Sequence, residues 1–110
     1  MKISFDEFKH LSNIAKHGIG FEEAIHVLLD PKRLDYLDQR KDYGKERRIT
    51  FGNLRTHVFV VVYVIRDKKI RVISMRKANE REKKNIIYLE INPENPPILS
   101  QEVALRTHST

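Results

Sequence analysis

The chain has 110 residues, of which 40% are hydrophobic, and it carries a formal net charge of +6 without any cysteine. This length suits one domain with a single core, and the lack of cysteine excludes disulfides and thiolate zinc sites. No apolar run reaches the roughly 18 residues of a membrane-spanning helix. The first residues also lack the apolar centre of a signal peptide. We therefore expect a cytoplasmic protein that makes no contact with a membrane.

The N-terminal third predicts two helices. Ser4 to Glu7 has the pattern of a capping box, and the apolar spacing from Phe5 onward continues to Gly18, a residue suited to end a helix. A second apolar stripe runs from Phe21 to Leu29, and Pro31 follows it.

The middle of the chain predicts strands. Residues 34–36 alternate weakly, as in an edge strand, and residues 47–51 form a second strand candidate. Between them, residues 39–44 are expected to form an exposed basic loop. The β-branched run 57–65 is the strongest strand and is expected at the centre of the sheet. A turn at Asp67-Lys68 leads into residues 70–75. In this last strand, one face is expected to hold Ile70, Val72 and Ser74, and the other Arg71, Ile73 and Met75.

Asn79 is placed to cap a final helix over about residues 80–90. The expected fold is thus an α+β domain over residues 1–91, with two N-terminal helices, a small antiparallel sheet of three to four strands and a C-terminal helix. Residues 92–110 form a proline-rich tail, which we expect to be disordered or docked through its few apolar side chains.

Positive charge concentrates between residues 66 and 84, which hold nine Lys and Arg against three Asp and Glu. Such a surface attracts a polyanion such as RNA or DNA. The alternative is an ordinary solvated face. Charge alone does not distinguish a nucleic-acid-binding surface from an ordinary solvated one.

The triplet Lys16-His17-Gly18 is the main candidate for chemistry. A histidine titrates near neutral pH, so His17 can act as general base or general acid, and Lys16 can hold a phosphate. RNA cleavage without metal needs these functions together with cations for the phosphorane charge. The alternative for His17 is a hydrogen bond to a carbonyl at the helix end.

Two arginines are candidates for that phosphorane charge. Arg47 and Arg76 lie on strands predicted to be neighbours, so both are expected to reach one phosphate. Alternatively, Arg76 pairs with Glu46 or Glu82. Glu82 is a candidate for assisting catalysis, although its spacing from Asn79 also completes a capping box.

Candidate RNA-binding residues are Lys9, Arg71, Lys77 and Arg81. Each of them is also compatible with a plain solvated surface or a salt bridge. The histidines show no metal-binding spacing, and no phosphate-binding or dinucleotide-binding glycine loop is present. No metal and no cofactor are therefore expected.

The order of the motifs resembles the BrnT family of bacterial toxins over roughly residues 3–88. The amino half of the resemblance rests on Phe5-Asp6-Glu7, Lys9, Asn13, Lys16-His17-Gly18, Phe21-Glu22-Glu23-Ala24 and Asp30-Pro31. The carboxyl half rests on Glu46-Arg47, Val62-Tyr63, Arg71, Ile73-Ser74, Arg76, Ala78 and Glu82. The chain departs from the family's usual pattern at Arg48, Met75 and Ile86.

This resemblance implies a toxin of a type II toxin–antitoxin pair with a fold related to RelE toxins. Such a toxin cleaves RNA, inhibits translation and arrests growth. The implied partner is a BrnA-type antitoxin with a ribbon-helix-helix domain, and operator DNA is bound only through the complex. The leading hypothesis is a metal-independent endoribonuclease that acts on single-stranded or ribosome-associated RNA. The alternatives are a non-catalytic basic nucleic-acid-binding or co-repressor module, and a degenerate toxin.

Overall fold

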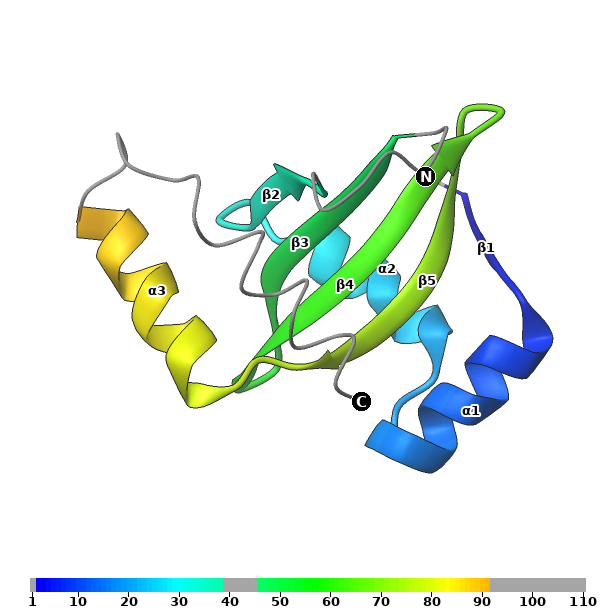
Figure 1. The fold of residues 1–110 in the computed structure, drawn as a ribbon, viewed down its shortest axis with the longest axis horizontal. Helices are drawn as coiled ribbons and strands as arrows, with labels where there is room; N and C mark the ends of the chain where they lie inside the picture. Colours follow the sequence, from blue (N-terminus) through cyan, green and yellow to red (C-terminus); the bar gives the residue numbers. More distant parts are fainter. Residues whose placement is uncertain (1, 39–45, 92–110) are drawn as a thin grey trace.

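The computed structural model describes residues 2–38 and 46–91, and side chains as far as Ile87. The predicted basic loop at residues 39–44 and the predicted tail at residues 92–110 lie outside the described residues. Within the described part, one sheet carries helices against both of its faces (Figure 1).

The sheet has five strands in the order β1-β5-β4-β3-β2. Their bounds are β1 Ile3–Phe5, β2 Leu34–Leu37, β3 Arg47–Leu54, β4 His57–Arg66 and β5 Lys69–Lys77. The antiparallel strands β2 to β5 follow the predicted order, and the valine-rich β4 lies at the centre as expected.

The predicted antiparallel sheet of three to four strands is wrong, because β1 adds a fifth strand that runs parallel to β5. This pairing joins Ile3 to Ile70 and Phe5 to Val72. A three-residue strand has too little length to show a period, and its partner lies far along the chain. Local pattern therefore gives no sign of this parallel pairing.

The hairpin between β4 and β5 turns at Asp67 and Lys68, as predicted, with φ of 52° and 62°. The predicted faces of β5 are wrong after Val72. A bulge opposite Val62 and Tyr63 shifts the alternation, so Val72 and Met75 face the same side.

The first helix, α1, spans Glu7–His17. Its N-cap is Asp6, which accepts from the Lys9 amide, and not the predicted Ser4, which lies within β1. Gly18 ends the helix with φ of 70°, as predicted. The second predicted helix consists of a 3₁₀ turn, η1, at Phe21–Glu23 and a short α2 at Ala24–Leu28.

The third helix, α3, spans Glu80–Ile91. Its predicted capping box is present, because Asn79 Oδ1 accepts from the Glu82 amide at 2.8 Å and Glu82 Oε1 accepts from the Asn79 amide at 2.9 Å. The two faces of the sheet hold separate cores. Phe21, Ala24, Val27 and Leu28 pack on Val61 and Met75, while Ile86 packs against the face that holds Val60 and Val62.

Helix α1 turns its apolar side chains toward solvent, whereas a surface helix usually turns them toward the core. Phe8, Leu11 and Ile14 are exposed, although their spacing suggested a core-facing stripe. The inward side of the helix instead carries Asn13 and the half-buried His10. Hydrogen bonds from Asn13 to Met75 and from the Phe21 amide to His10 hold this polar side of the helix against the protein.

Candidate functional site

Asn13 attaches α1 to the edge of β5. Its side-chain amide donates to the Met75 carbonyl at 2.7 Å and to the Ile19 carbonyl at 3.0 Å, and its Oδ1 accepts from the Met75 amide at 3.4 Å. The buried side-chain amide of Asn13 thus pairs with both the carbonyl and the amide of Met75, as the backbone of a neighbouring strand would. His10 adds a second anchor, because its Nδ1 accepts from the Phe21 amide at 3.1 Å. These bonds fix the end of α1, where His17 lies.

His17 is exposed and borders two grooves. The first, of about 450 Å³, lies between α1 and β5, with Lys9 and Lys16 on its α1 side and Ser74 on its β5 side. The second, of about 500 Å³, lies between the loop after α1 and the β3–β4 turn, and Lys77 lines it. An RNA strand running from one groove to the other would pass the imidazole.

The pKa of His17 is lowered from its ordinary value of about 6.5. Partial burial is the largest cause, followed by the positive charges of Arg76 and then Lys16. The imidazole is therefore mostly neutral at pH 7, which is the form of a general base.

Arg76, whose charge acts on His17, forms a buried ion pair with Glu82. Nη1 and Nη2 of Arg76 donate to Oε1 and Oε2 of Glu82 at 2.8 and 2.9 Å. Both side chains are almost fully buried, and Arg76 Nε has no hydrogen-bond partner among the described residues. Glu82 and the Lys77 carbonyl thus engage three of the five N–H donors of the Arg76 guanidinium, and the charge of Arg76 acts on His17 from a buried position.

The structure does not bring Arg47 together with His17 and Arg76. Strand β4 separates β3 from β5, and Arg47 pairs with Val64 whereas Arg76 pairs with Val60. Four residues along a strand correspond to roughly 13 Å. The Arg47 side chain lies instead 3.3 Å from a carboxylate oxygen of Asp38.

The other predicted RNA-binding residues are spread over the surface. Lys9 lies on the first groove and Lys77 on the second, so both adjoin His17. Arg71 lies opposite Ser4 and Val64, farther along β5, and Arg81 lines a separate shallow groove at the start of α3.

Sequence reasoning missed three features of this site. Asn13 was noted only as part of a motif, because a polar residue within a helix gives no sign of the strand it will meet. Arg55 and His57 line the second groove near the β3–β4 turn. Nothing in their local pattern indicates that this turn meets the end of α1.

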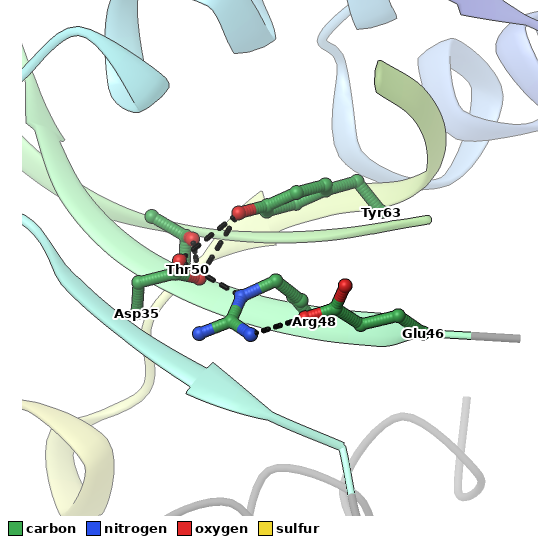
Figure 2. Close-up of polar contacts among 5 residues, drawn as sticks. All are labelled: Asp35, Glu46, Arg48, Thr50 and Tyr63. Atoms are coloured by element: carbon green, nitrogen blue, oxygen red, sulfur yellow. Dashed lines mark hydrogen bonds and ion pairs between the residues drawn. The ribbon is translucent and has the colours of Figure 1, made fainter. Parts of the chain in front are cut away.

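A second polar cluster lies toward the β2 edge of the sheet, on β2, β3 and β4 (Figure 2). Asp35 accepts hydrogen bonds from Thr50 Oγ1 at 2.7 Å, from the Tyr63 hydroxyl at 3.1 Å and from Arg48 Nε at 2.9 Å. Arg48 also donates to Glu46 at 2.7 Å, so Glu46 is the partner of an arginine. Burial and then the Asp35 charge raise the pKa of Tyr63. The network ties β2, β3 and β4 together.

Two further observations bear on the class of protein. In residues 2–38 and 46–91, no group of three His, Cys, Asp or Glu side chains is arranged to hold a metal ion. The helices in these ranges are also too short or too polar to span a bilayer.

Comparison with known families gives the class of the protein. The model for "Ribonuclease toxin, BrnT, of type II toxin-antitoxin system" matches residues 5–82. The chain belongs to this BrnT family of ribonuclease toxins, and membership implies RNA as substrate and an antitoxin as partner. No curated protein matches the chain.

Proposed function

We propose that the chain is a metal-independent endoribonuclease with His17 as its general base. The observation that carries this proposal is the position of His17, exposed between two grooves and next to the buried charge of Arg76. Its lowered pKa keeps it ready to accept a proton at neutral pH.

In the proposed reaction, His17 removes the proton from a ribose 2′-hydroxyl. The 2′-oxygen then bonds to the adjacent phosphorus, and the bond from phosphorus to the 5′-oxygen breaks. The leaving oxygen takes a proton from Lys16 or from solvent. The products are a 2′,3′-cyclic phosphate and a 5′-hydroxyl end, so atoms and charge balance without a metal-bound water.

The cations around His17 have separate roles in this proposal. Lys16, together with Lys9, holds the phosphate in the first groove, and Lys77 holds the strand in the second. Arg76 stabilises the phosphorane charge through its electrostatic field, which already acts on His17. Glu82 orients Arg76 and does not itself transfer a proton, because both of its oxygens accept hydrogen bonds.

Toxicity follows from this activity: loss of RNA inhibits translation and arrests growth in the cytoplasm. The proposed partner is a BrnA-type antitoxin, through which the complex binds operator DNA. The antitoxin class is supported by family membership.

The test is a gel assay of labelled RNA with the purified protein in excess EDTA. We expect fragments that end in 2′,3′-cyclic phosphate. His26→Ala is the matched control for His17→Ala, because His26 is also an exposed histidine in the last turn of a helix. Intact RNA after long incubation would contradict the proposal.

One observation favours a second candidate, a non-catalytic RNA-binding or co-repressor module. Glu82 occupies both terminal nitrogens of Arg76, which leaves fewer donors for a phosphorane. This candidate predicts a shifted but uncut band in the same gel, and binding that weakens steeply with salt.

A further inference from the structure

Helix α1 presents an apolar face to solvent. Phe8, Leu11 and Ile14 are 86%, 54% and 41% exposed, and they lie three residues apart on one side of an 11-residue helix. The opposite side is held to the protein by Asn13 and His10. An amphipathic helix that is anchored by polar groups and exposes its apolar stripe is typical of a surface that a partner covers.

This stripe, Phe8–Leu11–Ile14, adjoins the candidate site. Phe8 and Ser12 line the same groove as Lys16 and His17. A partner lying on the stripe would therefore also cover the groove in which we place the RNA phosphate.

Charge identifies the chemistry of the partner. Lys9 and Lys16 border the stripe on its groove side, and the chain as a whole carries +6. Two copies of this chain would bring like charges together, which disfavours self-association. An acidic partner would gain from the same charges.

We propose that the Phe8–Leu11–Ile14 stripe is the docking surface for an acidic amphipathic segment of the antitoxin, which neutralises the toxin by covering the groove beside His17. An 11-residue helix is about 16 Å long, so a partner helix of about three turns would match it. Apolar side chains of that segment pack on Leu11 and Ile14, and its carboxylates face Lys9 and Lys16. The proposal rests on the proposed function for the identity of the partner.

The test uses the double variant Leu11→Gln/Ile14→Gln and the antitoxin encoded by the adjoining gene. The matched control is Leu29→Gln/Ile65→Gln, since these side chains are 57% and 44% exposed, close to the values of the tested pair. Calorimetric titration measures binding, and the RNA gel measures cleavage with and without antitoxin. Thermal melts check that both variants fold.

We expect the tested variant to bind the antitoxin at least about 30-fold more weakly than the parent, while the control binds like the parent. The tested variant should still cut RNA and should escape inhibition. Equal binding by both variants would overturn the proposal. So would a parent dimer, seen in sedimentation, that only the tested variant dissociates, because the occupant would then be a second copy.

The two proposals can fail separately. If no form of the protein cuts RNA and binding is lost only in the tested variant, the docking surface stands and the proposed chemistry fails. If the parent cuts RNA and both variants remain inhibited, the chemistry stands and the docking surface fails.

Discussion

Two arginine–carboxylate clusters lie toward opposite edges of the sheet, one on β2 to β4 and the other between β5 and α3, and they differ in what surrounds them. Arg76 pairs with Glu82 and acts on the exposed His17, whereas Arg48 pairs with Asp35 within a network that includes Thr50. Arg76 retains a buried Nε without a partner in the described residues. Ion pairing alone therefore does not mark a functional site here. The Arg76 cluster differs in lying near an exposed imidazole, that of His17, which borders two open grooves.

The largest expected effect is that of Glu82→Ala on the Arg76 cluster. The change leaves Arg76 buried without its counter-charge and removes half of the capping box, and breaking such a pair costs about 3–5 kcal/mol. Urea denaturation should show this loss, and Glu82→Gln should lose less. If Glu82→Ala were as stable as the parent, the Arg76–Glu82 ion pair would have to be exposed to water, which contradicts the prediction.

Asp35→Ala should reduce stability and leave the chemistry intact. It removes the shared acceptor of Thr50, Tyr63 and Arg48, and each unsatisfied buried group costs about 1–3 kcal/mol. Urea melts should show the loss. The rate of RNA cleavage by the folded variant, below its unfolding transition, should match that of the parent. A large loss of rate would place this second cluster in the site.

Asn13→Ala should affect both stability and activity. The change removes the bonds that join α1 to Met75 and Ile19, at about 1–3 kcal/mol, and frees the end of α1 that carries His17. Cleavage should fall even where the variant is fully folded. Glu7→Ala is the control, because Glu7 is an exposed residue of the same helix that lines neither groove. If Asn13→Ala cuts RNA at the parent rate, the anchor does not position His17.

The smallest expected effect is a shift in pH dependence. Cleavage should rise with pH through the lowered pKa of His17, since the neutral imidazole is the active form. Lys16→Gln removes one of the positive charges that lower this pKa, so the rising limb should move to higher pH. Cleavage rates measured between pH 4.5 and 8 would show this shift, because the range begins about two pH units below the ordinary pKa of histidine and extends above it. A shift to lower pH would contradict the electrostatic account.

Much of the fold could be predicted from local pattern, because local chemistry determines it. The β-branched run of β4, the Asn79–Glu82 box and the Gly18 stop each depend on residues close in sequence. The parallel pairing of β1 and the bulge near Ile73 depend on distant partners, and no local period shows them.

The candidate site could be predicted in part. His17 was selected from its own chemistry and its place at a helix end, and the structure places it on two grooves, while its catalytic role stays a prediction. The separation of Arg47 from Arg76 depends on the strand order, which places β4 between them. The apolar face of α1 points outward because Asn13, on the other side of the helix, forms hydrogen bonds with the backbone of β5. The spacing of residues within the helix does not predict bonds to a strand so distant in sequence.

The central claim is that His17 is the base of an RNA-cleaving site beside Arg76. Its most direct test is the cleavage rate of His17→Ala relative to His26→Ala, measured in EDTA on the same labelled RNA. We predict a loss of at least about 100-fold for His17→Ala and none for His26→Ala. Equal rates for the two variants would contradict the account.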